Sequence, residues 1–302
     1  MNDESIELFT LWALRENGLV EKLCDNAWTP AELAVETDMS ERAAAILTAA
    51  LTDWGYLERE RDAYQSTADF ERLESDDIET MGVLPHRLDS LERYLELPAT
   101  IQGQDPPKGD AESARTLAAA MATIDESVVR ASVTAAEHVH PRPERVLDVG
   151  GGPGNFAVEF ARRGATVTLV DLPAVVEAVA PTIDVPDVEC VAGNVLEGLP
   201  DGQDLAFCSR LTHVFSPEDN RRLFREIYSS LEPGGTVVCT DFVRGRSERA
   251  ATFAVHMLAQ TSGGNTYDEE TYMRLLDDSG FVDTEIRNIP GTEFQAIVGH
   301  RP

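Results

Sequence analysis

Residues 146–171 carry the pattern that most strongly constrains how this chain can fold. A short apolar run containing Asp148 leads into the segment GGGPG, a helical pattern follows, and a second apolar run closes the unit. Gly150, Gly152 and Gly154 stand where the chain turns from strand to helix, and glycine allows both a sharp turn and a close approach of backbone to ligand. The unit predicts a parallel α/β sheet with a ligand at the carboxyl ends of its strands.

The acid after the second apolar run narrows the class of ligand. Asp171 stands where a carboxylate can accept hydrogen bonds from both hydroxyls of a ribose. The glycines are spaced G-x-G-x-G, whereas dinucleotide-binding loops have G-x-G-x-x-G. With Asp148 just before the glycines, the loop resembles that of class I methyltransferases, in which this acid lies near the amino-acid part of S-adenosylmethionine. We therefore predict S-adenosyl-L-methionine as the cofactor, with a nicotinamide dinucleotide and a tight turn without ligand as the alternatives.

The chain after Glu144 continues the same alternation. Five apolar runs of strand length are separated by helical patterns, the last of which spans Pro217–Leu231. These runs are RVLDVG, TVTLVD, VECVAG, DLAFCSR and TVVCTDFV. Alternating strands and helices predict a parallel sheet with right-handed crossovers. The final runs, TEIRNIP and EFQAIVGH, have no helix between them and predict a terminal hairpin.

The N-terminal part of the chain has a different pattern. A capping box at Thr29–Glu32 begins one short helix, and Ser40 caps the next. Two short strands then surround a turn at Arg61-Asp62, which completes a helix, turn, helix and two-stranded wing. Residues 76–139 carry apolar stripes at helical spacing and end in a proline-rich break.

These patterns together predict an α/β protein in three parts. Residues 1–75 form an all-α winged-helix domain, and residues 76–140 supply linker and substrate-pocket helices. Residues 141–302 form a Rossmann-like class I methyltransferase domain.

The charge of the chain is strongly acidic. Asp and Glu number 54 against 25 Lys and Arg, a net charge of −29, and only Lys22 and Lys108 are lysines. One interpretation is a surface made for a basic partner. The other is a surface adapted to a salt-rich cytoplasm, where ions screen the self-repulsion. The even spread of the acids and the scarcity of lysine favour the salt-adapted, halophile-like surface.

Other features of the composition exclude several classes of protein. The acidic N-terminus does not resemble a signal peptide, and no apolar run is long enough to cross a bilayer. We expect a soluble cytoplasmic protein that does not enter membranes. None of the four cysteines falls in a CxxC pair, so we expect no metal site. Residues 1–70 hold 15 acids against five cations, so we expect no binding to nucleic acid.

The whole pattern resembles a known enzyme family. The α/β part, the winged-helix segment and residues 211–243 together resemble the plant-type small-molecule O-methyltransferases, a family that includes acetylserotonin and hydroxyneurosporene methyltransferases. The resemblance implies transfer of a methyl group from S-adenosylmethionine to a hydroxyl of a small, aromatic or otherwise apolar molecule. It also implies a homodimer formed through the N-terminal module.

The resemblance implies two catalytic residues. His213 occupies the position of the family's general base, and Asp241 that of the acid that orients this base. A phenol, with a pKa of about 10, is a weak nucleophile at neutral pH, and a histidine can remove its proton as the methyl group transfers. A surface histidine and a strand-end cap are the alternative interpretations of these two residues.

The resemblance also implies binding residues. To the loop acids and glycines, Asp148, Gly150, Gly152, Gly154 and Asp171, it adds Leu172, Asn194, Val195 and Ser209 for the cofactor and Met257 for the acceptor ring. Asn194 stands where the family has an acid that bonds the adenine amino group, and Val195 stands where the next residue packs on the adenine ring. Ser209 stands where the family often has a basic residue near the cofactor. For Met257, a place in the ordinary core of its helix is at least as good an interpretation as a contact with the acceptor.

The match to the catalytic pocket is incomplete. Thr266 stands where the family has a glutamate that helps to hold the histidine, and we interpret it as a capping box with Glu269. This departure leaves two alternatives open: C-methylation, decarboxylation or hydroxylation on the same fold, and a regulator that binds the cofactor without catalysis.

Overall fold

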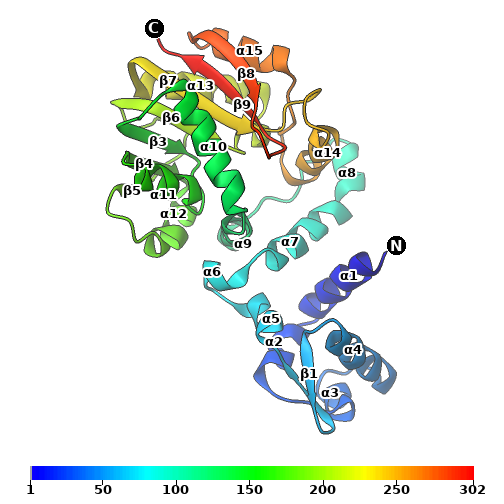
Figure 1. Ribbon diagram of the computed structural model, residues 1–302. Helices are drawn as coiled ribbons and strands as arrows, with labels where there is room; N and C mark the ends of the chain where they lie inside the picture. The colour runs from blue at the N-terminus through cyan, green and yellow to red at the C-terminus, as the bar shows by residue number, and fades with distance from the viewer. Residues whose placement is uncertain (1) are drawn as a thin grey trace. The chain divides into compact units, whose positions relative to one another are not determined.

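The structure of the protein is a computed structural model that describes residues 2–302. The chain forms two compact units, one that ends at Leu91 and one that spans Glu92–Pro302 (Figure 1). Each unit has its own hydrophobic core. The predicted division into three parts concerns the roles of segments and stays a prediction.

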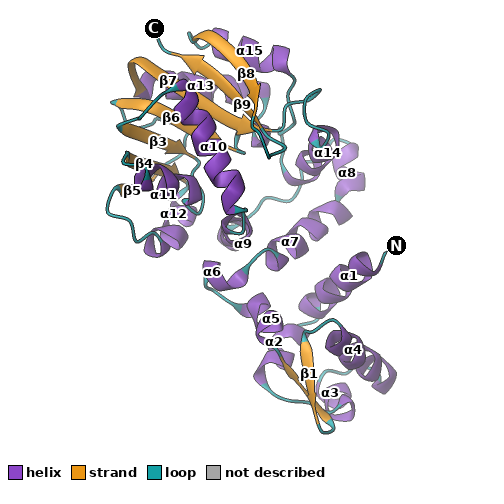
Figure 2. Ribbon diagram, in the orientation of Figure 1, coloured by secondary structure: helices purple, strands orange, loops and turns teal. Residues whose placement is uncertain are grey.

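The N-terminal unit consists of short helices and one hairpin (Figure 2). The predicted capping box at Thr29–Glu32 is present, and Ser40 accepts a hydrogen bond from the backbone N–H of Ala43. The elements are α1 (Asp3–Glu16), α2 (Leu19–Asp25), α3 (Pro30–Glu36), α4 (Glu41–Asp53), β1 (Leu57–Glu60), β2 (Ala63–Ser66), α5 (Ala68–Glu71), η1 (Arg72–Glu74), α6 (Ile78–Met81) and most of α7 (Leu84–Leu95). Strands β1 and β2 pair antiparallel around the predicted turn, where Arg61 has a φ of 57°.

The C-terminal unit is built on a seven-stranded sheet in the order β5-β4-β3-β6-β7-β9-β8. The strands are β3 (Arg145–Val149), β4 (Thr166–Asp171), β5 (Val188–Ala192), β6 (Gln203–Ser209), β7 (Leu231–Asp241), β8 (Val282–Asn288) and β9 (Gln295–His300). The first five strands in this order are parallel, and β9 and β8 form the predicted antiparallel hairpin. The predicted α/β fold class is thereby confirmed.

Helices cover both faces of this sheet (Figure 1). Side chains of β3 and β6 alternate between two cores, because successive residues of a strand point to opposite faces. Val146 and Phe207 pack with α10 and α11, whereas Leu147 and Cys208 pack with α13 and α15. The helical elements are α8 (Leu97–Ile101), α9 (Ala111–Ala122), α10 (Glu126–Val139), α11 (Asn155–Arg162), α12 (Pro173–Val179), η2 (Ala180–Thr182), η3 (Thr212–Val214), α13 (Pro217–Ser230), α14 (Ala250–Gln260) and α15 (Glu269–Asp277).

One local prediction was wrong. Helix α15 does not begin with a capping box at Thr266, because its N-cap is Asp268, whose side chain accepts a hydrogen bond from the N–H of Thr271. Thr266 is fully buried and its hydroxyl donates to the carbonyl of Ala250 at 2.9 Å. Because the buried hydroxyl of Thr266 needs a hydrogen-bond partner within the protein, it bonds to Ala250, and the helix is capped two residues later by Asp268.

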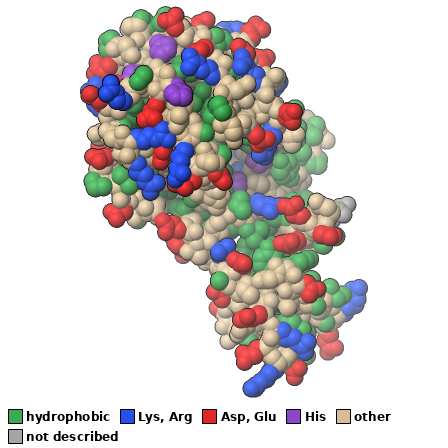
Figure 3. All heavy atoms as spheres, in the orientation of Figure 1, with side chains coloured by type: hydrophobic (Ala, Val, Ile, Leu, Met, Phe, Trp, Pro, Cys, Tyr) green, Lys and Arg blue, Asp and Glu red, His purple; other side chains and the backbone are tan. Residues whose placement is uncertain are grey.

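The surface reflects the acidic composition. Asp and Glu side chains are scattered over the face shown in Figure 3 and do not gather in one patch. None of the helices in the described part of the chain is long and apolar enough to cross a membrane.

The aromatic centre of one core gives a test of this fold. Phe207 is fully buried, and its ring lies 5.1 Å from that of Phe156 and 5.2 Å from that of Phe160. We expect Phe207→Ala to lower the free energy of unfolding by roughly 3–5 kcal/mol, because it leaves a cavity. Urea unfolding followed by far-ultraviolet circular dichroism measures this loss. Ile101→Ala, at a side chain 68 % exposed, is the control and should change stability by less than about 0.5 kcal/mol. Equal losses in the two variants would contradict the proposed core.

Candidate functional site

The candidate site lies where the strand order reverses. Strand β3 has β4 on one side and β6 on the other, so the connections leave in opposite directions, and ligands of open α/β sheets bind at the carboxyl ends of the strands at such a point. Four polar residues predicted from the sequence lie at or next to these ends, on four neighbouring strands: Asp148, Asp171, Ser209 and Asp241.

The glycine turn after β3 has the backbone that only glycine adopts readily. Gly150, Gly152 and Gly154 have φ angles of 66°, 51° and 83°, all in the left-handed region. Gly154 is also the N-cap residue of α11. The spacing of the glycines therefore follows from the path of the chain.

The turn also has no room for a side chain at Gly150 or Gly151. A Cβ added to Gly150 would lie 2.8 Å from the side chain of Leu211, and one added to Gly151 would lie 2.6 Å from Leu169 and 2.9 Å from Asp148. The backbone of the turn is thus packed against β4, the segment after β6 and the first acid of the site.

Asp148 is buried without a partner. Its side chain is 1 % exposed, and neither carboxylate oxygen has a hydrogen-bond partner among residues 2–302. Burial, assisted by the charge of Asp171, raises the pKa of Asp148 to about 7, and the nearby N–H of Ala157 offsets only part of this effect. A buried carboxylate of this kind needs a donor or a positive charge from a ligand.

Asp171 is tied to the glycine turn. One carboxylate oxygen accepts from the N–H of Gly152 at 2.8 Å, and the other accepts from the N–H of Leu172 at 2.7 Å. Burial raises the pKa of Asp171, and these two hydrogen bonds oppose the rise. Each oxygen keeps a lone pair for a further donor, as the predicted contact with ribose hydroxyls requires.

The remaining residues predicted for the cofactor follow β4 and β5 or end β6. Leu172 is 52 % exposed, and Val195 is buried. Asn194 donates to Glu197 at 2.8 Å and accepts from the N–H of Leu196 at 3.1 Å, which leaves one lone pair on its amide oxygen. The hydroxyl of Ser209 accepts from that of Thr240, on the neighbouring strand β7.

His213 and Asp241, the two predicted catalytic residues, are in contact. The imidazole Nδ1 lies 2.8 Å from Oδ1 of Asp241, and both side chains are buried. Burial by itself raises the pKa of Asp241, but the interactions with His213 and the hydrogen bonds from Thr212 and Phe242 outweigh it, so the pKa lies below its usual value. An ionised Asp241 keeps the proton of a neutral imidazole on Nδ1 and leaves Nε2 as the basic nitrogen.

Thr212 and Tyr272 hold this pair, and the sequence did not reveal them. The Thr212 hydroxyl donates to Oδ2 of Asp241 at 2.6 Å and lies 2.8 Å from the hydroxyl of Tyr272. The N–H of His213 also donates to Oδ2, at 3.2 Å. Hydrogen-bonding residue types at these positions carry no distinctive spacing, so only the fold identifies them.

Aromatic rings lie beside His213. The ring of Phe253, on α14, meets the imidazole edge-on at 4.7 Å between centroids and lies 4.8 Å from the ring of Phe242. Met257 lies one turn further along α14 and is 5 % exposed, so its role as acceptor contact or as helix core stays open. Thr266 bonds to α14 and supplies no second acid at His213.

The arrangement fits the predicted cofactor. The unpartnered Asp148 suits the ammonium group of an amino acid, and Asp171 has free lone pairs for hydroxyls. The close-packed glycine turn between them presents backbone and not side chains. Among residues 2–302 no group of three or more His, Cys, Asp or Glu side chains is arranged to hold a metal ion.

Comparison with known proteins gives the family. A family model described as an O-methyltransferase domain matches residues 106–282. The chain is 32 % identical over 157 residues to a 3-amino-4-hydroxybenzoate 4-O-methyltransferase of Streptomyces cremeus, across 48 % of this chain and 42 % of that protein. It is 28 % identical over 166 residues to an acetylserotonin O-methyltransferase of Gallus gallus, across 52 % and 47 %. These matches span about half the length of the curated relatives.

The fold is shared with solved structures. One of them, PigF with SAH, superposes with a TM-score of 0.74 at 21 % identity and covers 99 % of this chain and 97 % of that one. The similarity supports the fold predicted from the sequence, and the matched domain includes the glycine turn, His213 and Asp241. The chain belongs to the O-methyltransferase domain family.

Proposed function

We propose that the protein is an S-adenosylmethionine-dependent methyltransferase that acts on a hydroxyl of a small aromatic or apolar molecule. The observation that carries the proposal is the buried pair of His213 and Asp241, which lies at the carboxyl ends of β6 and β7 in the same sheet as the glycine turn after β3. The family of the chain and the names of its relatives support this assignment. A cytoplasmic location and a salt-adapted surface stay predictions.

In this proposal the residues of the turn hold the cofactor. Asp148 binds the amino-acid part, Asp171 the ribose, and Asn194 and Val195 the adenine. Leu172 and Ser209 complete the cofactor contacts. S-adenosylmethionine supplies, when bound, a methyl group activated by a sulfonium centre.

His213 acts on the acceptor. Asp241 holds the proton of Nδ1, so Nε2 accepts the proton of the acceptor hydroxyl as the oxygen is methylated. The negative charge of Asp241 stabilises the imidazolium that results. The rings of Phe242 and Phe253 give an aromatic acceptor an apolar surface beside the base. Orientation of the oxygen toward the methyl group supplies the rest of the rate increase.

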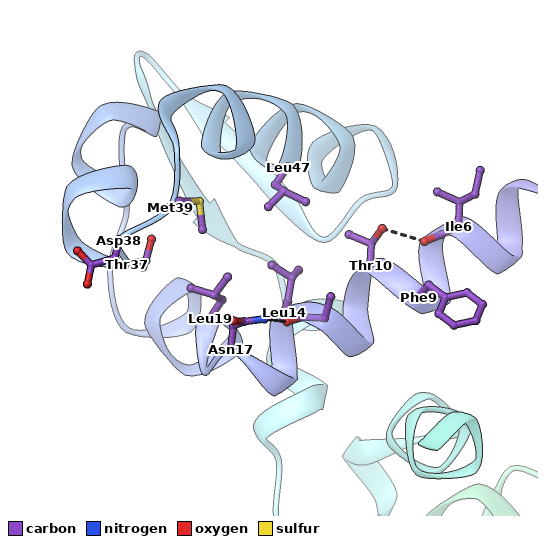
Figure 4. A pocket seen from close by; sticks show the side chains of 11 residues that line it. Ile6, Phe9, Thr10, Leu14, Asn17, Leu19, Thr37, Asp38, Met39 and Leu47 are labelled. Carbon is purple, nitrogen blue, oxygen red and sulfur yellow. Dashed lines mark hydrogen bonds between the residues drawn. The ribbon is translucent and has the colours of Figure 1, made fainter. Parts of the chain in front are cut away.

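We also propose a homodimer formed through the N-terminal unit. A groove of about 620 Å³ on this unit is lined mostly by apolar side chains of α1, α2 and α4 and of the turn before α4 (Figure 4). Ile6 is 46 % exposed and Phe9 37 %, a large apolar exposure for residues on one helix of an isolated chain. A second copy of the chain would cover this surface.

The role of His213 can be tested directly. We expect His213→Ala to lower kcat by roughly 10²–10⁴-fold toward an accepted phenol, because the general base is lost. A radiolabelled methyl-transfer assay measures the rate, and product mass shows whether one methyl group was added. His138→Ala, at an exposed histidine of α10, is the matched control. An unchanged rate in His213→Ala would exclude the base role, and a product without an added methyl group would favour one of the alternative chemistries.

The role of Asp148 predicts that removing its charge raises the stability of the protein without ligand and weakens binding of the cofactor. The raised pKa means that stability from this group is present below about pH 4 and is lost as pH rises through about 7. We expect Asp148→Asn to melt higher than the parent protein at pH 8 without ligand, by about 5 °C or more. The two proteins should converge near pH 4. Calorimetry should show weaker binding of S-adenosylhomocysteine to the variant, and equal binding would contradict the assigned contact.

The dimer proposal is tested by a charge in the groove. Phe9→Asp places a carboxylate on each of the two symmetry-related surfaces, so we expect the protein to run as a monomer in size exclusion with light scattering. Val35→Asp, at an exposed valine outside the groove, should leave the mass unchanged. A parent protein that is already monomeric at micromolar concentration would overturn the proposal.

A further inference from the structure

Arg210 stands at the carboxyl end of β6, next to the site, and one nitrogen of its side chain has no partner. It follows β6 directly, and its Nε is fully shielded from solvent without a hydrogen-bond partner in the described part of the chain. No carboxylate among residues 2–302 lies within ion-pair distance of it, although the chain has 54 acids. The side chain as a whole is half-buried, and a shielded guanidinium nitrogen without a partner is costly, so a ligand that supplies an acceptor would stabilise it.

The backbone of Arg210 is held in an uncommon conformation. Its φ is 54°, in the left-handed region that a residue with a Cβ rarely adopts. Its N–H donates to the carbonyl of Thr240 at 2.8 Å, directly before Asp241 on β7. Left-handed residues of this kind cluster at functional sites, where the surroundings enforce them.

The neighbours of Arg210 place it between the two halves of the site. Leu211 packs against the position of Gly150 in the cofactor turn, while Thr212 and His213 bond to Asp241. Burial lowers the pKa of Arg210, and the charge of Asp241 opposes this effect.

Asp241 cannot serve as the missing partner. Its two oxygens already accept four hydrogen bonds, from the hydroxyl of Thr212, from the N–H and Nδ1 of His213 and from the N–H of Phe242. These bonds use the lone pairs that a guanidinium would need. An anion of a bound molecule would therefore be a suitable partner for Arg210.

We propose that Arg210 binds a carboxylate of the methyl acceptor, so that the preferred acceptor is an aromatic hydroxy acid and not a neutral phenol. The planar guanidinium matches the two oxygens of a carboxylate. The rings of Phe242, Phe253 and Phe294, joined by centroid distances of 4.8 and 4.6 Å, offer the surface for the aromatic part. This inference rests on the proposed function, since it assigns the acceptor of that same site.

The cofactor is the other source of a carboxylate, because S-adenosylmethionine carries one. The experiment separates the two sources by measuring binding at equilibrium. The full-length protein is saturated with S-adenosylhomocysteine, and calorimetry then compares 4-hydroxybenzoate with 4-hydroxybenzyl alcohol, and 6-hydroxy-2-naphthoate with the matching alcohol. The affinity for S-adenosylhomocysteine alone is measured in parallel. No methyl transfer is needed, so failure of the proposed catalysis would leave this result readable.

We expect the parent protein to bind each acid roughly tenfold or more tightly than its alcohol. Arg210→Met should remove this preference and change the affinity for S-adenosylhomocysteine less than twofold, and Arg210→Lys should keep part of it. Arg142→Met is the matched control, because Arg142 has the same left-handed backbone, with a φ of 55°, but is exposed before β3. If Arg210→Met does not fold, as judged by thermal melting, Arg210→Gly replaces it, since glycine suits the left-handed backbone.

Three results would overturn the inference. The first is a parent protein that binds acids no better than alcohols, or binds neither. The second is a variant at Arg210 that keeps the preference for acids. The third is loss of affinity for S-adenosylhomocysteine with the preference intact, which would assign Arg210 to the carboxylate of the cofactor.

Discussion

The buried carboxylate of Asp241 organises the catalytic half of this protein. It accepts hydrogen bonds from four donors, three of which belong to the two residues Thr212 and His213 of the short turn after β6. A buried charge without partners is costly, so the conformation of the turn that supplies these donors is favoured. The position of the imidazole is thus a consequence of satisfying Asp241, and Tyr272 extends the network into the core.

Two charged side chains at the site contain shielded atoms without partners, and they indicate where ligands bind. Asp148 and the Nε of Arg210 are shielded from water without partners, one with opposite charge to the other, at the ends of the neighbouring strands β3 and β6. A folded protein bears such costs when a bound molecule removes them. Asp148 fits a cation and Arg210 an anion, which is why we assign them to different parts of the ligand set.

The sequence was a good guide wherever a local rule has one structural solution. The glycine spacing predicted the turn, because three left-handed residues in a row of five positions require glycine. The capping box at Thr29 and the hairpin turn at Arg61 are also present as predicted, because short local patterns specify both. The capping box predicted at Thr266 was wrong. The Thr266 hydroxyl donates a hydrogen bond to the carbonyl of Ala250 and therefore does not cap the helix.

The sequence alone determined the parallel α/β fold and the cofactor loop, because strand–helix alternation and glycine positions are local signals of chain geometry. Resemblance to a family supplied His213 and Asp241 as candidates, and the structure decided that they touch. Only the tertiary structure distinguished Arg210 from the other arginines of the chain, and only it brought Thr212, Tyr272 and Phe253 to the pair. Burial and the absence of a partner are properties of packing between strands and helices far apart in the chain, and no spacing along the sequence encodes them.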